Sequence, residues 1–145
     1  MGDADATARL GDCYYRGLGV ERDPSRAVGF YIQAADSGSV EGMYAAGCEL
    51  LCGRHCGSDH ARAFRYLGAA SEAGDGRAMN ALALMYLGGL HVGRDRRTAR
   101  RLFRKAARLG DEGAKMNLDT MRRAGRRAGL RGIWITMTDG GEDVA

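Results

Sequence analysis

The side chains of this chain that are most able to bind metal or to react are thiols and imidazoles. They are gathered in one short stretch, mostly at a spacing of four residues. The group consists of Cys48, Cys52, His55, Cys56 and His60. Cysteine and histidine are the ligands that structural zinc prefers. On a straight helix the four members at this spacing would climb about 18 Å at 1.5 Å per residue, which is too far to share one ion. A common site would therefore need Gly53 and Gly57 to break the helix and fold the segment back.

Three interpretations of this stretch are open. In the first, Cys48, Cys52 and Cys56 hold a zinc ion together with a histidine, which would make the chain a metal-regulated module. In the second, two of the cysteines form a disulfide, which would make the chain a redox-regulated module. In the third, these cysteines and Cys13 are free thiols, and Cys56 occupies a place where other parts of the chain have a buried valine. We expect the third, with no bound metal and no cofactor.

Nucleophilic catalysis has one conceivable pair of residues, Cys56 and His60. A thiol nucleophile needs a base, a group that orients the base, and a pocket for the substrate. The sequence offers no orienting group, no serine in a nucleophile elbow, and no phosphate-binding glycine motif after a strand. We therefore expect no enzymatic activity.

The elements that position these residues follow from a repeat of 36 residues. Asp23, Asp59 and Asp95 recur at that step. The same step relates Gly17, Gly53 and Gly89; Ala27, Ala63 and Ala99; Ala34, Ala70 and Ala106; and Gly38, Gly74 and Gly110. A fixed period of this length is typical of stacked helix pairs. The pattern predicts repeats at 3–38, 39–74 and 75–110, and a degenerate terminal cap at 111–131.

Each repeat is expected to contain two helices, which makes the fold all-α. Apolar residues at helical spacing predict the first helix over about residues 5–16. The second helix begins after Asp23, because Asp followed by Pro24 is a strong helix-start signal, and it ends near Gly38. Between the helices, Leu18 and Val20 are expected to tuck under them.

The pattern of the first repeat resembles the Sel-1-like repeat, a relative of the tetratricopeptide repeat. The residues that carry the resemblance are Leu10, Gly11, Tyr14, Gly17, Gly19, Val20, Asp23, Ala27, Phe30, Tyr31, Ala34, Ala35 and Gly38. The resemblance implies a right-handed α-α solenoid of helix-turn-helix repeats with period 36. It also implies a non-catalytic adaptor or scaffold that binds a partner protein or peptide on the concave face of the repeat arch.

In such an arch the first helix of each pair usually lines the concave side, so positions there that differ between repeats are candidates for partner contact. Two rows have this property, one formed by Thr7, Met43 and Met79 and the other by Asp12, Cys48 and Leu84. Methionine suits an adaptable peptide-binding surface. The candidate partner-binding residues are Asp12, Met43, Cys48, Met79 and Leu84. Packing between repeats is the alternative role for these side chains.

The compartment is expected to be the cytoplasm. Some secreted proteins with this repeat join the second helix of one repeat to the next repeat by a disulfide. The corresponding positions here are Ala35 with Met43 and Ser71 with Met79, none of which is a cysteine. The absence of this disulfide weakens a secreted assignment. The start of the sequence lacks a basic and apolar signal stretch, and no run approaches the about 18 apolar residues of a membrane span. We therefore expect no membrane partner.

Charge is distributed unevenly along the chain. Residues 1–90 contain 8 basic and 11 acidic side chains, whereas residues 91–145 contain 14 basic and 7 acidic ones. The predicted basic patch comprises Arg97, Arg100, Arg101, Arg104, Lys105, Arg108, Arg122, Arg123, Arg126 and Arg127, within an Arg-rich field at 94–131. The patch is either a solvated face or a surface for an acidic partner. An acidic partner could be a protein or a nucleic acid, so the alternative function is a nucleic-acid-associated protein that uses this field. It is less expected because no aromatic residues are interleaved in the field to stack on bases.

The last part of the chain, 132–145, has a short apolar segment with Ile133, Trp134 and Ile135, followed by an acidic end. A solenoid needs its terminal repeat to be covered. We expect the tail to provide this cover, and the alternative is a docking segment for a partner.

Overall fold

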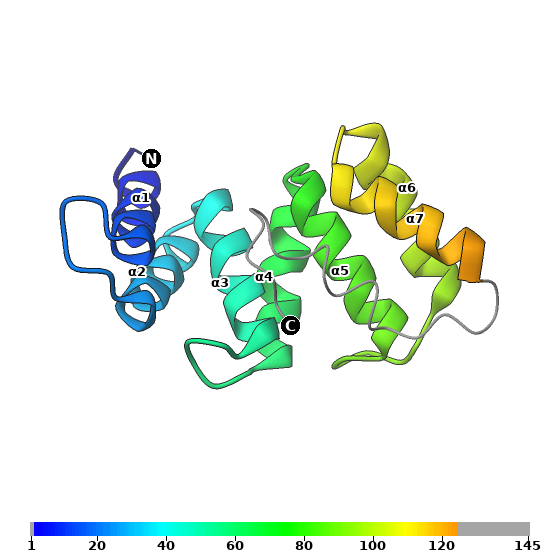
Figure 1. Cartoon of the computed structure of the whole chain (residues 1–145), viewed down its shortest axis with the longest axis horizontal. Coiled ribbons are helices and arrows are strands. Elements are labelled where there is room, and N and C mark those ends of the chain that lie inside the picture. The colour runs from blue at the N-terminus through cyan, green and yellow to red at the C-terminus, as the bar shows by residue number, and fades with distance from the viewer. Residues whose placement is uncertain (1, 125–145) are drawn as a thin grey trace. The chain divides into compact units, whose positions relative to one another are not determined.

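The computed structural model describes residues 2–124, and this part of the chain consists of seven helices and their connections (Figure 1). The helices are α1 (Gly2–Arg16), α2 (Pro24–Asp36), α3 (Val40–Cys52), α4 (His60–Glu72), α5 (Gly76–Gly88), α6 (Arg96–Arg108) and α7 (Glu112–Ala124). Packing joins α1 with α2, α3 with α4 and α5 with α6, and α7 packs against α6 and α5. The predicted all-α fold of sequential helix pairs is confirmed. The predicted tail at 132–145, the end of the predicted cap, and Arg126 and Arg127 of the basic patch lie outside the described residues.

The second helix of every pair begins at an aspartate, as the sequence predicts. The side chains of Asp23, Asp59 and Asp95 accept hydrogen bonds of 3.0 to 3.1 Å from backbone N–H groups three residues later. Pro24 occupies the first turn of α2. These caps satisfy N–H groups that have no partner inside the helix. They therefore set the helix starts independently of what packs on the helix.

Several of the helices are followed by a glycine whose backbone is in the left-handed conformation, with a positive φ angle. Gly53 has a φ of 64° at the end of α3, and Gly38 has a φ of 96° just after α2. A side chain at such a φ is strained, whereas glycine adopts it without cost. The predicted role of Gly38 as the residue that ends the second helix is confirmed.

One expectation about the loop between the first two helices is wrong. Leu18 is 57% exposed and Val20 is 36% exposed, so neither side chain tucks under the helices. The loop turns at Gly17 and Gly19, and a side chain added at Gly19 would meet no atom within 4 Å. The loop therefore projects away from α1 and α2 (Figure 1).

The helices form two compact units, Met1–Ala73 and Gly74–Ala145. In the first unit, α2 and α3 approach so closely that a Cβ atom at Gly42 would lie 2.7 Å from Ala34 Cβ and 2.8 Å from the Ala35 backbone nitrogen. The same unit holds α1 against α3, so the two helix pairs stack on each other inside it. Small residues at these positions are what permit this stacking.

The second unit, as far as it is described, has a core built from α5, α6 and α7. Phe103 of α6 is fully buried, and Ala114, Asn117 and Met121 of α7 are buried on the side that packs on its neighbours. The start of the predicted cap is thus a helix whose inner face belongs to this core.

Candidate functional site

The cysteine and histidine stretch does not assemble into a metal site. Cys52 is the last residue of α3, Cys56 lies in the following loop, and His60 is the first residue of α4. Within residues 2–124, no group of three or more His, Cys, Asp or Glu side chains is placed to hold a metal ion. None of Cys13, Cys48, Cys52 and Cys56 forms a disulfide within the part of the chain that the structure describes.

The environment of two of these thiols disfavours the reactive thiolate. Desolvation by the surrounding chain, and next the negative charge of Glu49, raise the pKa of the Cys52 thiol, although the Cys52 residue is exposed at the end of α3. The same two causes raise the pKa of the half-buried Cys56 thiol. The Cys56 thiol also faces the backbone oxygen of Glu49 at 3.5 Å. A nucleophilic cysteine needs the opposite environment, in which positive charge lowers the thiol pKa.

The first unit instead gathers a cluster of hydroxyl, carboxyl and imidazole groups, which we call the Tyr15 cluster: Asp12, Tyr15, Tyr31, Glu49 and His55. The Tyr31 hydroxyl donates a hydrogen bond of 2.7 Å to the Asp12 carboxylate. The Tyr15 ring lies 6.5 Å from the Tyr31 ring and meets the His55 ring edge-on at 5.5 Å. His55 Nδ1 lies 3.0 Å from Glu49 Oε2. Side chains from α1, α2, α3 and the loop after α3 thus form one continuous set of contacts.

The electrostatics of the cluster favour a neutral Tyr31. Burial, the hydrogen bond to Asp12 and the negative charges of Asp12 and Glu49 all raise the pKa of the Tyr31 hydroxyl far above its usual value. Tyr31 is therefore a fixed hydrogen-bond donor, which holds Asp12 in place on the surface of α1.

Sequence reasoning found Asp12 but missed the other four members of the cluster as interaction residues. A signal was present in the repeat, because Tyr15 stands where the next two repeats have Leu51 and Leu87. Tyr31 likewise stands where they have Leu67 and Phe103. The first repeat therefore differs from the next two in carrying a hydroxyl group at both of these otherwise apolar positions. Only the structure shows that the two tyrosines lie together.

The candidate partner-binding residues are divided by the structure. Asp12 is exposed on α1, and Met43 and Cys48 are half-buried on α3. Met79 is 4% exposed and Leu84 is 0% exposed on α5, so both contribute to the interior. Whether Asp12, Met43 and Cys48 contact a partner stays a prediction.

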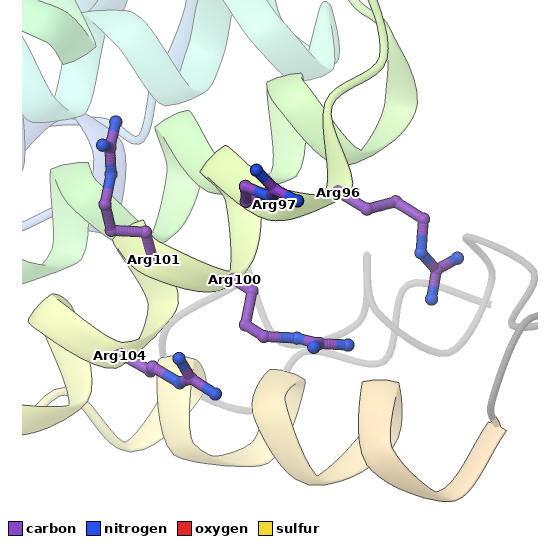
Figure 2. A pocket seen from close by; sticks show the side chains of 5 residues that line it. All are labelled: Arg96, Arg97, Arg100, Arg101 and Arg104. Carbon is purple, nitrogen blue, oxygen red and sulfur yellow. The ribbon is translucent and has the colours of Figure 1, made fainter.

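The basic patch is present on the surface of α6 and α7 as far as it is described. Arg97, Arg100, Arg101, Arg104, Lys105, Arg108, Arg122 and Arg123 are all exposed. An open pocket of about 440 Å³ is lined, among the described residues, by Arg96, Arg97, Arg100, Arg101 and Arg104 (Figure 2). The described lining thus consists of arginine side chains from a single helix, α6. Such a surface attracts anions.

Paired helices that recur every 36 residues, with charged and polar aromatic surfaces outside a core rich in alanine, define a helical-repeat protein. The Sel1 repeat model matches residues 4–39, 40–75 and 76–111. The chain therefore belongs to the Sel1 repeat family. Sel1 repeats generally mediate protein interactions, and the family is typically non-catalytic.

Solved structures with the same fold agree with this assignment. The chain is 30% identical to a Sel1 repeat protein from Oxalobacter formigenes, with a TM-score of 0.70 over 81% of this chain and 89% of that one. It is 25% identical to a protective antigen of uropathogenic Escherichia coli strains that displays an SLR fold, with a TM-score of 0.74. That match covers 94% of this chain and 30% of the antigen. No curated protein sequence matches the chain.

Between residues 2 and 124, no helix combines the length and the apolar character needed to cross a membrane.

Proposed function

We propose that this chain is a non-catalytic adaptor that binds a partner protein or peptide on the concave side of its repeats, through the surface shared by α1 and α3. The observation that carries the proposal is the contact between these two helices, the first helices of consecutive pairs, around the Tyr15 cluster. Asp12 lies exposed at this surface, and Met43 and Cys48 are partly accessible on α3.

The chemistry of this surface suits protein recognition. Tyrosine is enriched among the residues that contribute most to protein interfaces, because its rigid ring contributes area and its hydroxyl contributes a hydrogen bond. Tyr15 is half-buried, and its ring is held between Tyr31 and His55. A side chain fixed in this way loses little conformational entropy when a partner binds.

The proposal includes the extent and the location of the module. The repeat region would run over 1–131, and the tail at 132–145 would cover its end or dock a partner. We place the protein in the cytoplasm, a reducing compartment, and four cysteines that form no disulfide among the described residues support this placement.

The alternative function, association with nucleic acid through the field at 94–131, receives less support. Phe103, the aromatic residue of α6, is fully buried and so offers no ring for a base to stack on. On α7, Arg123 forms an ion pair of 2.9 Å with Asp119, and Lys115 forms one of 2.7 Å with Glu112. Part of the positive charge that phosphates would need is thus already neutralised.

The adaptor proposal is tested by affinity capture from a lysate of the source organism, with and without nuclease, at about 0.15 M and 0.5 M salt. Wild-type bait is compared with Cys48→Arg, which places a large charged side chain on α3, and with Asp12→Ala. We expect discrete proteins that survive both treatments and that are lost or reduced with either variant.

The matched control is Gln33→Arg on α2, an exposed position that is not part of the cluster. It adds the same charge as Cys48→Arg and should leave the capture unchanged. Circular dichroism verifies that each bait is folded. A capture that disappears with nuclease, or that is the same for all four baits, would contradict the proposal.

A further inference from the structure

Helix α6 carries a concentration of exposed positive charge. Arg100, Arg101 and Arg104 are exposed, and within residues 2–124 no ion pair involves any of the three. The neighbouring helix α7 is different, because two of its basic side chains pair with acidic ones on the same helix. The charges of Arg100, Arg101 and Arg104 are therefore available to a ligand.

The local helix electrostatics make this arrangement costly for the isolated chain. α6 has no acidic residue in its first turn, where Arg96 and Arg97 lie at the positive end of the helix dipole. Like charges three or four residues apart also repel one another along the helix. The negative charge of Asp95 offsets part of this repulsion at the start of the helix. Asp95 is the N-cap and accepts hydrogen bonds from the Thr98 side chain at 2.7 Å and the Thr98 backbone at 3.0 Å. A bound anion would remove the remaining repulsion.

The residues that line the site indicate a ligand with several negative charges. The pocket of about 440 Å³ is open, and its described lining is five arginines (Figure 2). Small-molecule sites are usually lined mainly by apolar side chains with a few polar groups among them. The described lining of this pocket is made of arginine side chains, so the polar contacts that it offers to a ligand are guanidinium groups.

The spacing of the arginines selects an extended chain. Arg100, Arg104 and Arg108 are exposed at steps of four residues, and four residues of a helix rise about 6 Å. Alternate side chains of an extended peptide point to the same side and are about 6.6 Å apart. Carboxylates at alternate positions can therefore reach successive arginines, and the planar guanidinium matches a carboxylate with two parallel hydrogen bonds.

We propose that α6 binds an extended, carboxylate-rich segment of a partner protein, with acidic residues at alternate positions lying along Arg100, Arg104 and Arg108. This second binding surface belongs to the second unit and does not depend on the α1 and α3 surface. Nucleic acid is the less favoured ligand, because α6 presents no exposed aromatic side chain.

The probe for the test is a fluorescein-labelled peptide with the core Glu-Ser-Glu-Ser-Glu, and its binding to the full chain is followed by fluorescence anisotropy at about 0.15 M salt. Arg100→Gln with Arg104→Gln should weaken binding about tenfold or more, because two charge-assisted contacts are lost. The matched control is Arg9→Gln with Arg16→Gln, two exposed positions on α1, which removes the same charge from the first unit. It should change affinity less than about threefold, because every arginine of α6 stays in place and only the net charge of the chain changes.

Three further arms separate the alternatives. A peptide of the same composition with its glutamates consecutive should bind more weakly, and equal binding would overturn the extended register. Single-stranded and duplex DNA of matched charge should also bind more weakly than the peptide. Tighter DNA binding, with an affinity that falls steeply with salt, would overturn the proposal in favour of a nucleic-acid interface.

Two results concern the variants themselves. An unchanged affinity in the Arg100→Gln and Arg104→Gln protein, shown by circular dichroism to be folded, would overturn the proposal. Asp12→Ala and Cys48→Arg should bind the probe like wild type. A failure of the adaptor surface therefore remains distinguishable from a failure of α6.

Discussion

The side-chain amide of Asn117 on α7 donates a hydrogen bond of 2.8 Å to the side-chain oxygen of Asn80 on α5. Both residues are buried, with Asn117 at 0% and Asn80 at 5% exposure. A buried polar group stabilises a fold only while its partner is present. This contact therefore makes the position of α7 specific, and it ties the last described helix to the pair that precedes it.

Replacing Asn117 with alanine should lower the free energy of unfolding by about 2 to 3 kcal/mol, because Asn80 loses its partner and a cavity remains. Urea unfolding followed by circular dichroism measures the change. Met116→Ala, at an exposed site on the same helix, should stay within about 0.5 kcal/mol of wild type. Equal stability of the two variants would show that the contact contributes nothing.

Two glycine-to-alanine substitutions should change the stability of the chain in opposite directions. A Cβ at Gly42 would lie 2.8 Å from the Ala35 backbone nitrogen, and backbone cannot move cheaply, so Gly42→Ala should destabilise the chain by about 1 to 3 kcal/mol. A Cβ at Gly29, inside α2, meets no atom within 4 Å. Gly29→Ala should therefore stabilise the chain by about 0.5 to 1 kcal/mol through helix propensity. Thermal unfolding of both variants checks this, and a Gly42→Ala protein as stable as Gly29→Ala would refute the close approach of α2 and α3.

Stability at alkaline pH should depend on Tyr31. Because its pKa is raised in the folded state, the folded chain holds the phenol proton more tightly than the unfolded chain does. This contribution is complete below pH about 10, the usual pKa of tyrosine, and is lost as the pH rises above it. Tyr31→Phe should cost about 0.5 to 1.5 kcal/mol at pH 7 and make the decline above pH 10 shallower. Urea unfolding across pH 7 to 11 measures both effects, and an equally steep decline in the variant would argue against this role.

Glu49→Gln should make Cys52 and Cys56 react faster with iodoacetamide near pH 8. The charge of Glu49 is the second cause, after burial, of the raised pKa of both thiols, and its removal should increase the thiolate fraction. Mass spectrometry of the alkylated chain gives the rate at each cysteine as a function of pH. A lower pKa shifts the midpoint of this profile, whereas a loosened loop raises only its plateau. Glu41→Gln, an exposed site on the same helix, is the control and should leave the midpoint unchanged.

The sequence by itself determined the features that depend on short stretches of chain. A cap needs only Asp23 and the N–H groups three residues on, and a helix end needs only a residue such as Gly38 that tolerates a positive φ. Such interactions form wherever the local sequence permits them. Because these local signals recur every 36 residues, they predict a series of helix pairs, and the recurring residues were enough to indicate the family.

Only the tertiary structure decided which side chains of those helices face a neighbour and which face solvent. Met79 and Leu84 lie at positions equivalent to partly accessible ones on α3, yet both are buried. Tyr15 and His55 are 40 positions apart in the sequence, yet their rings meet in the Tyr15 cluster. Burial and contact are sums over several helices, so a repeat pattern, which treats every pair alike, cannot specify how one pair differs from the next.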